Sequence, residues 1–586
     1  MQISSRRARA RSIVVVGALL ASPLVATGSA HADDPAPVEV VPPDGVDLGG
    51  TPAGFDLSAD GRWVVHTGRK GAAYGIHLVD RTTGSSSPVL SGGTPVGQLS
   101  VSADGRRIAY VLGDVGAAYD GDAQVRLLDR TAGTDTLVSA TPGGAAGNGV
   151  SYEPQISDDG SAVAFTSRAT NLVSGTSGPG SDVVVREVGS GASELVSAGG
   201  ATAGAWAPTI SGDGDRVAFV TDAAVPGDDD TSLDVAVRTR STDTLALVSA
   251  GAGTANATAP AISADGGSVA HLVAEGSSPE LVHSGIHVTR LESGATERAG
   301  VDVDGVLRSP GVAPVLSHDG RFVLFTAVAL GRGKHAIETF VRDLGLGTTH
   351  WVSTASQPGA FYIAGSAISG DGRFVAYSSF ATDGTRRWVA DLGEPTAVAA
   401  PRNTTLPAVS RGRAPKGPSY ALTVRPGTWS DAAGVTTSHQ WLRDGRPIAG
   451  ATGTSYVVRR ADLGRRIAVR ETVGRAWGEP EQATSTATRV TRASSQLRAT
   501  AAPTKVGRPV VLRVRVTHGL GVRPQGKVVV RWGKRSRGVR VDADGRMTLR
   551  VRGLRSGRHT VRVSFSPTPF VKAAPVVKVK VRVWRR

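Results

Sequence analysis

The sequence predicts an all-β protein, and three observations support this fold class. A four-residue turn motif recurs through the first two-thirds of the chain. Short runs rich in Val and Ala follow most of its copies, separated by stretches of Ser, Thr and Gly. In strands of the last hundred residues, such as residues 511–516 and 577–583, apolar and basic residues alternate strictly. Short strands at regular spacing, separated by turn residues, are typical of propellers and sandwiches.

The recurring motif is Ser-x-Asp-Gly, and it occurs seven times. Its aspartates are 44, 55, 54, 52, 54 and 52 residues apart, close to the period of blade repeats, which is about 40 to 50 residues. Asp-Gly favours a hairpin turn, because glycine adopts positive φ without a steric penalty. The copies occupy residues 58–61, 102–105, 157–160, 211–214, 263–266, 317–320 and 369–372.

Each repeat supplies four short strands, one before the motif and three after it. Four short strands per repeat make one propeller blade, so the repeats predict a seven-bladed β-propeller over residues 33–400. The seventh repeat has a poorly defined outer strand, while residues 38–41 precede the first repeat without a blade of their own. We expect these two segments to pair and so remove an exposed sheet edge.

These repeats resemble the TolB-type, WD-like propeller repeats, whose pattern is Pro-x-Ile-Ser-x-Asp-Gly-Arg-x-Val-Ala-Phe followed by Asp-x-x-Val-Arg-Asp and a Thr-Gly turn. The similarity covers residues 37–400, although the Arg after the motif is missing in repeats three to five. The resemblance implies a binding or scaffold module, sometimes fused to a peptidase. It implies no active residue, because the Asp-Gly motif is structural in that family.

Two further domains follow, at residues 401–491 and 492–586. The first contains residues 426–429 and 440–445, which resemble the small bacterial immunoglobulin-like repeats. Its Trp441 is expected in the core, because a β-sandwich without a disulfide needs a large apolar side chain between its sheets. The second resembles another such repeat. We therefore expect two immunoglobulin-like β-sandwich domains after the propeller.

The N-terminus has the layout of a cleavable signal peptide over residues 1–32. Four arginines precede an apolar run at residues 13–21, and small residues then lead to cleavage near Ala32. No other segment is long and apolar enough to span a bilayer. We expect a secreted or cell-surface protein. The absence of cysteine excludes disulfides and thiolate chemistry.

Charge is distributed unevenly along the chain. Residues 33–400 carry 23 Lys or Arg against 42 Asp or Glu, a net charge of −19, and residues 401–490 carry 14 against 6, a net charge of +8. Residues 491–586 carry 25 against 2, a net charge of +23. An acidic body is thus joined to a strongly basic tail.

Strand alternation in this tail places valine inward and the basic residues outward. We expect the outward set to bind an anionic envelope polymer by electrostatics. Two alternatives remain, a merely solvated surface and a tail that docks on the acidic propeller. Sequence-specific reading of nucleic acid is not expected, because aromatic residues are sparse there. The outward set is Arg513, Arg515, Arg550, Arg552, Lys578, Lys580 and Arg582.

No catalytic motif is present, and the histidines are scattered. The leading hypothesis is a non-enzymatic, monomeric binding or scaffold protein whose propeller binds a protein or glycan. The alternative is a propeller-based polysaccharide-active enzyme, a lyase or hydrolase, with a site built from distant blades. No cofactor is expected. Calcium is a weak candidate at Asp228, Asp230 and Asp234, in a loop without the glycine and glutamate of a full calcium-binding loop.

Overall fold

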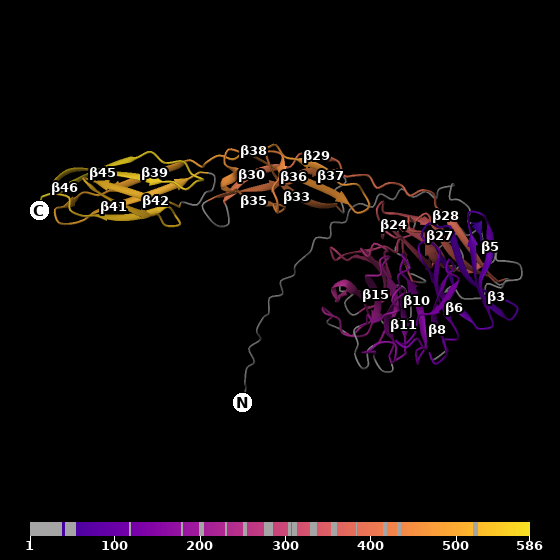
Figure 1. Ribbon diagram of the computed structural model, residues 1–586. Coiled ribbons are helices and arrows are strands. Elements are labelled where there is room, and N and C mark those ends of the chain that lie inside the picture. The colour runs from indigo at the N-terminus through magenta and orange to yellow at the C-terminus, as the bar shows by residue number, and fades with distance from the viewer. Residues whose placement is uncertain are drawn as a thin grey trace, which may run out of the picture. The chain divides into compact units, whose positions relative to one another are not determined.

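The protein is described from a computed structural model of the 586-residue chain. The chain divides into two compact units, the first ending at Thr396 and the second covering Ala397–Arg586 (Figure 1). The structure describes residues 38–40, 54–116, 119–176, 180–197, 204–228, 231–249, 255–274, 285–302, 306, 313–328, 337–352, 360–381, 384–413, 419–430, 435–519 and 525–585. The expected signal peptide lies outside them. No helix of the described part is long and apolar enough to cross a membrane.

The first unit contains seven four-stranded antiparallel sheets within its described residues. Six consist of consecutive strands, and the short η1 helix (Arg240–Thr242) joins two strands of the fourth sheet. The first sheet contains β2 (Phe55–Leu57), β3 (Trp63–Lys70), β4 (Ala73–Asp80) and β5 (Ser85–Gly92); the second contains β6 (Val96–Val101), β7 (Arg107–Leu112), β8 (Gln124–Asp129) and β9 (Thr134–Leu137); and the third contains β10 (Ser151–Ile156), β11 (Ala162–Ser167), β12 (Asp182–Glu187) and β13 (Ser193–Leu195). The fourth contains β14 (Ala205–Ile210), β15 (Arg216–Thr221), β16 (Asp234–Thr239) and β17 (Thr244–Leu247), and the fifth contains β18 (Asn256–Ile262), β19 (Ser268–Ala274), β20 (Gly285–Arg290) and β21 (Ala295–Arg298). The sixth contains β22 (Val315–Leu316), β23 (Phe322–Val328), β24 (Ile337–Asp343) and β25 (Thr348–Trp351), and the seventh contains β26 (Ala360–Ile368), β27 (Phe374–Ala381), β28 (Gly384–Asp391) and β1 (Val38–Glu39).

The seventh sheet is completed by the N-terminal strand. β1 pairs antiparallel with β28, with Val38 opposite Val389 and Glu39 opposite Trp388. The backbone N–H of Val40 also donates to the carbonyl oxygen of Arg387 at 2.8 Å. The predicted pairing of the N-terminal segment with repeat seven is therefore confirmed for residues 38–40, and Val41 lies outside the described residues. Because of this pairing β28 is not an edge strand.

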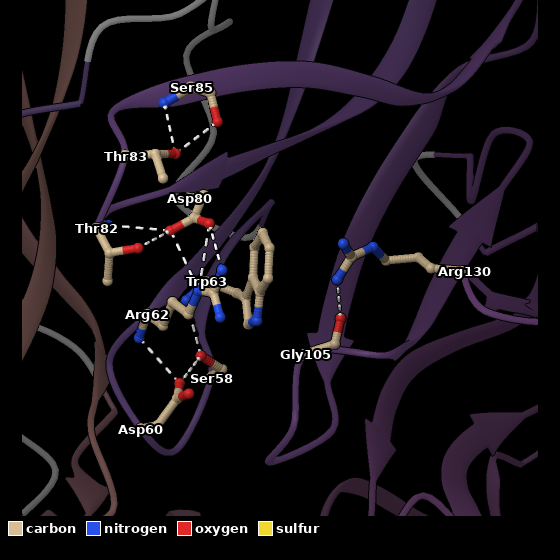
Figure 2. A network of polar contacts seen from close by, with 10 residues as sticks. All are labelled: Ser58, Asp60, Arg62, Trp63, Asp80, Thr82, Thr83, Ser85, Gly105 and Arg130. Carbon is tan, nitrogen blue, oxygen red and sulfur yellow. Dashed lines mark hydrogen bonds and ion pairs between the residues drawn. The ribbon is translucent and has the colours of Figure 1, made fainter.

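The Ser-x-Asp-Gly motif forms the turn between the first and second strands of each sheet. In the first copy Ser58 Oγ donates to Asp60 Oδ1 at 2.6 Å and accepts from the Trp63 N–H at 2.8 Å (Figure 2). Asp60 Oδ1 also accepts from the Arg62 N–H at 2.9 Å. The same three hydrogen bonds recur in the other six copies. The motif is therefore a structural turn in every repeat.

The motif glycine has a second role at the contact between sheets. Gly105 has φ +71°, and a Cβ added there would lie 2.4 Å from Cδ1 of Trp63 in the preceding sheet. At Gly61 the added atom would lie 2.2 Å from Cδ2 of Phe374 in the seventh sheet. Glycine is thus required both by the turn and by the close approach of the neighbouring sheet.

Backbone hydrogen bonds join the seven turns into a closed ring. The Ala59 N–H donates to the Ala103 carbonyl oxygen at 3.0 Å, and the ring closes where the Gly370 N–H donates to the Ala59 oxygen at 2.8 Å. Radial repetition of four-stranded sheets around a ring defines a β-propeller. The intermediate bonds run from Ala103 N to Asp158 O, Asp159 N to Gly212 O, Gly212 N to Ala264 O, Asp265 N to His318 O, and His318 N to Gly370 O.

Arginines next to the motif form ion pairs with the aspartate that ends the third strand. Arg62 and Asp80 approach to 2.7 Å in the first sheet (Figure 2), and Arg321 and Asp343 to 2.7 Å in the sixth. The guanidinium and two Thr82 hydrogen bonds hold the pKa of Asp80 well below its usual range. Similar pairs occur in the second and seventh sheets, whereas repeats three to five lack this arginine.

The second unit begins with a β-sandwich built around Trp441. This side chain is fully buried, its Nε1–H donates to the Gly453 carbonyl oxygen at 2.8 Å, and its ring centroid lies 5.7 Å from that of Tyr456. Its predicted position in the core is confirmed. The elements are β29 (Asn403–Thr405), β30 (Ala408–Arg413), β31 (Tyr420–Arg425), β32 (Thr428–Trp429), β33 (Val435–Arg443), β34 (Arg446–Pro447), β35 (Ser455–Val457), η2 (Arg460–Asp462), β36 (Arg466–Arg475), β37 (Glu481–Thr484) and β38 (Thr488–Arg489).

The last segment forms another sandwich, called here the basic sandwich. One sheet has the order β39-β41-β44 and the other β40-β46-β45-β42-β43. Their inward valines, with Leu512, Met547 and Phe565, belong to one buried core. The strands are β39 (Ser495–Ala501), β40 (Thr504–Lys505), β41 (Val510–His518), β42 (Lys527–Trp532), β43 (Arg535–Arg540), β44 (Arg546–Val551), β45 (Gly557–Ser566) and β46 (Val577–Trp584).

Candidate functional sites in the propeller channel and on the basic sandwich

A cavity of about 550 Å³ lies within the ring of the first unit, and we call it the channel. It is lined by residues of the first strands of all seven sheets, together with the second residue of most motif copies. Its volume falls in the range of about 300 to 1,000 Å³ that small-molecule sites occupy. The channel is therefore the candidate ligand site of the propeller.

Two side chains meet across one end of the channel. They are Asp158 and His318, which occupy the second motif position in the third and sixth repeats, and His318 Nε2 lies 2.9 Å from Asp158 Oδ2. The hydrogen bond to the carboxylate raises the pKa of His318 above its ordinary value. The other five copies have only Ala or Gly at this position. Because the other five positions carry small residues, the channel has room for the longer side chains of Asp158 and His318.

Two neighbouring glycines leave little free space around the Asp158–His318 pair. A Cβ at Gly370 would lie 2.8 Å from His318 Cγ, and a Cβ at Gly212 would lie 3.1 Å from Asp158 Oδ2. Larger residues at these two positions would displace the Asp158–His318 pair.

Asp56 is a second acidic group in the channel wall. Its Oδ1 accepts from the Leu57 N–H at 2.8 Å and its Oδ2 from the Val101 N–H of the next sheet at 2.9 Å. Burial raises the pKa of Asp56 to about 7, and the negative charge of Asp158 adds to the effect. The carboxyl group thus changes charge near neutral pH, although part of the residue still faces the cavity.

Glu153 links three consecutive sheets of the ring. Its Oε2 accepts from Thr166 Oγ1 at 2.8 Å and from the Ala207 N–H at 2.9 Å, while its own N–H donates to Gln98 Oε1 at 2.8 Å. Burial raises the pKa of this carboxyl. The first strand of a blade has no strand partner on its inner side, so such side chains satisfy its backbone donors. Part of the polar lining therefore serves the fold.

On the basic sandwich, one outer face carries a row of arginines. Arg498 lies opposite Arg515, and Arg515 lies opposite Arg546 across the three strands of the β39-β41-β44 sheet. Arg513 and Arg550 extend the same face, and all five residues are exposed. We call this set the arginine face. Sequence reasoning identified Arg513, Arg515 and Arg550 but missed Arg498 and Arg546, which only the strand register brings into line.

The other sheet presents a second basic surface, called the mixed face. Arg562 lies opposite Arg531 on one side and opposite Lys578 on the other, while Arg558 lies opposite Arg582. Lys580 lies on the same outer side of β46, and all six residues are exposed. The expected residues Lys578, Lys580 and Arg582 thus belong to a different face from Arg513, Arg515 and Arg550. Arg552 is exposed just beyond β44.

The basic sandwich offers these cations almost no acidic partner. Residues 491–586 contain only Asp542 and Asp544, both in the turn before β44. Asp542 Oδ1 accepts from the N–H groups of Asp544 at 3.0 Å and Arg546 at 2.7 Å. Within residues 491–519 and 525–585, no Lys or Arg forms an ion pair with a carboxylate.

The structure describes two of the three calcium candidates, Asp228 and Asp234. Asp234 is buried at the start of β16, where its Oδ1 accepts from Ser249 Oγ at 2.6 Å. Asp182 and Ser197 form the equivalent contact in the preceding sheet at 3.2 Å, so this is a repeated structural contact. Asp230 lies outside the described residues. No group of three His, Cys, Asp or Glu that could hold a metal ion occurs among those that are described.

Two pairs of histidines that sequence reasoning did not connect lie side by side across strands. The ring centroids of His66 and His77 are 5.3 Å apart, and those of His271 and His287 are 5.9 Å apart. Burial lowers the pKa of His66 to about 3 and that of His271 to about 4. The imidazoles of His66 and His271 are therefore neutral at physiological pH and belong to the interior of their sheets.

A scan against models of protein families found no match, and a search of curated proteins found none either. Among solved structures, an oligogalacturonate lyase in complex with manganese is 14% identical, with a TM-score of 0.45, covering 62% of this chain and 95% of that one. TolB from Acinetobacter baumannii is 15% identical, with a TM-score of 0.32, covering 57% and 65%. The propeller domain of the Trilobed protease from Pyrococcus furiosus is 11% identical, with a TM-score of 0.40, covering 60% and 96%.

Proposed function

We propose that this chain is an exported, non-enzymatic attachment protein. After cleavage near Ala32, the basic sandwich binds an anionic polymer of the cell envelope, and the propeller binds a protein or glycan at its channel. In this proposal the seven sheets are the blades of a seven-bladed propeller over residues 33–400. The two sandwiches are immunoglobulin-like domains at residues 401–491 and 492–586, and the protein acts as a monomer outside the cell.

The observation that carries the proposal is the alignment of like charges on the basic sandwich. Arg498, Arg515 and Arg546 lie opposite one another without a carboxylate between them. Like charges directly opposite across strands destabilise a sheet. A polyanion laid over such a row supplies the missing negative charge, and Arg forms bidentate hydrogen bonds with phosphate and carboxylate groups. A surface built only for solubility has no need of such a row.

Retention of the mature chain on a polyol phosphate column over a range of salt concentrations tests this function. Counterion release makes such binding fall steeply as salt rises. A chain ending at residue 490 serves as the control and should elute at low salt. Salt-insensitive retention would indicate a specific pocket instead. Stronger retention of residues 401–586 than of the mature chain would indicate that the tail docks on the acidic propeller.

A second function, a polysaccharide-active enzyme, is favoured by one observation. Asp158 and His318 converge at 2.9 Å, and Asp56, whose pKa is raised to about 7, lies in the same channel. A carboxyl group with a raised pKa in the same cavity as an imidazole is a candidate for general acid and base catalysis. Incubation of the mature chain with acidic and neutral polysaccharides tests it, by release of new reducing ends or unsaturated products. Release abolished by Asp158→Asn would replace the binding proposal for the channel.

A further inference from the structure

The basic sandwich has two cationic surfaces, and they lie on opposite sides of one core. Inward residues of both sheets, such as Leu512 and Val563, belong to the same buried cluster. Strand alternation therefore directs Arg515 and Arg562 to opposite outer sides. A linear polymer lying on one surface does not cover the other.

The two surfaces are also electrostatically separate. The sheets of a sandwich are about 10 Å apart, and the outward side chains increase the distance between the two sets of charges. The Debye length at physiological ionic strength is only about 8 Å. A polyanion on the arginine face consequently neutralises little of the charge on the mixed face.

We propose that one basic sandwich binds two linear polyol phosphate chains at once, one on each face, and so cross-links them. This inference rests on the proposed attachment function and adds the number of polymer chains that one basic sandwich binds. Each face alone presents at least five exposed cations. The repeated charges along one chain are therefore matched by several side chains on each side of the sandwich.

The composition of the faces favours a polyol phosphate over a nucleic acid as occupant. Single-stranded nucleic acid binds through aromatic platforms as well as through charge. Trp584 is an exposed aromatic side chain of the basic sandwich, and the guanidinium of Arg582 already lies 3.8 Å from its ring centroid. The arginine face has no aromatic residue among its outward positions on β39, β41 and β44.

A two-step capture experiment on the full mature chain tests the cross-link. Poly(glycerol phosphate) is fixed to a surface at low density, the protein is bound at low salt, and fluorescent poly(glycerol phosphate) is then added. The protein that is retained should recruit the labelled polymer. Its monomeric state at the loading concentration is checked by light scattering, so that recruitment is not due to oligomers.

Two matched variants separate the faces. Arg498→Gln/Arg513→Gln/Arg515→Gln/Arg546→Gln neutralises the arginine face, and Arg531→Gln/Arg562→Gln/Lys578→Gln/Lys580→Gln neutralises the mixed face. Each should still bind the fixed polymer, but recruitment of labelled polymer should fall about tenfold or more, because the cations that release counterions on one side are gone. Hydrogen exchange checks that both variants remain folded.

The outcomes separate this inference from the attachment function. If the wild-type chain does not bind the fixed polymer, the attachment function itself is wrong. If it binds but recruits no labelled polymer, or if one variant behaves like wild type while the other loses all binding, the sandwich has one site and the cross-link is wrong. Preferential recruitment of single-stranded DNA of equal charge would overturn the choice of polymer.

Discussion

The propeller and the basic sandwich use arginine in opposite ways. In the propeller, Arg62 and Arg321 approach aspartates to 2.7 Å and join the motif turn to the end of the third strand. In the basic sandwich, Arg498 and Arg515 lie opposite each other on exposed positions without a carboxylate partner. The first arrangement neutralises charge within the fold. The second leaves charge available to a ligand and weakens the sheet that carries it.

This difference shows that the residue type alone does not indicate its role. An arginine serves the fold where the end of the third strand provides a carboxylate, and it is available for binding where the strand register provides another arginine. Substitutions in both regions of the molecule test this difference, and the largest effect is expected in the propeller.

The buried ion pair of the sixth sheet provides the strongest test. Arg321→Met leaves Asp343 buried without its guanidinium partner, and we expect a loss of about 3 to 5 kcal/mol in the free energy of unfolding of the propeller. Chemical denaturation followed by tryptophan fluorescence measures it. Arg465→Met removes an exposed pair with Asp444 and should change stability by less than about 1 kcal/mol. Equal effects of the two variants would contradict the assignment of a structural role to the buried pair.

The second test concerns Asp56 and pH. Its pKa is raised from 3.8 to about 7, so the folded propeller binds this proton more tightly than the unfolded chain does. The contribution of Asp56 to the free energy of unfolding is therefore at its maximum below about pH 4, and it is lost as pH rises to about 7. At 1.36 kcal/mol per pKa unit, the loss is at most about 4 kcal/mol.

Asp56→Asn removes this titration. We expect the variant to gain stability relative to wild type at pH 8 but not at pH 4, as measured by thermal unfolding at both values. A difference between variant and wild type that does not change with pH would mean that the carboxyl group keeps its charge in the channel, against the raised pKa.

The smallest effect is expected on the arginine face, where a substitution should stabilise the sheet instead of destabilising it. Arg515→Glu places a carboxylate between Arg498 and Arg546, and each opposite-charge pair across strands contributes about 0.2 to 1 kcal/mol. Hydrogen exchange of β41 should slow, while retention on polyol phosphate should weaken. Arg515→Gln, which removes the charge without reversing it, should give values between those of wild type and the Glu variant in both measurements. Faster exchange in the Glu variant would show that Arg515 stabilises the sheet.

Some features of this protein could be predicted from the sequence because local chemistry determines them. The Ser-x-Asp-Gly turn forms within six residues through the Ser58, Asp60 and Trp63 contacts, so its recurrence alone indicated seven sheets. Period-two alternation is equally local, and it correctly directed Arg513 and Lys578 outward. The pairing of residues 38–40 with β28 followed from counting strands, since a sheet short of one strand has an open edge.

The tertiary structure decided what depends on register and on ring closure. Asp158 and His318 are 160 positions apart in the chain and meet only because the third and sixth sheets face each other across the channel. The sequence signal was present, since they are the only residues other than Ala or Gly at the second motif position, but a distance across the ring is not encoded in any one repeat. Likewise, strand register alone separates the basic residues into two faces and aligns Arg498, Arg515 and Arg546.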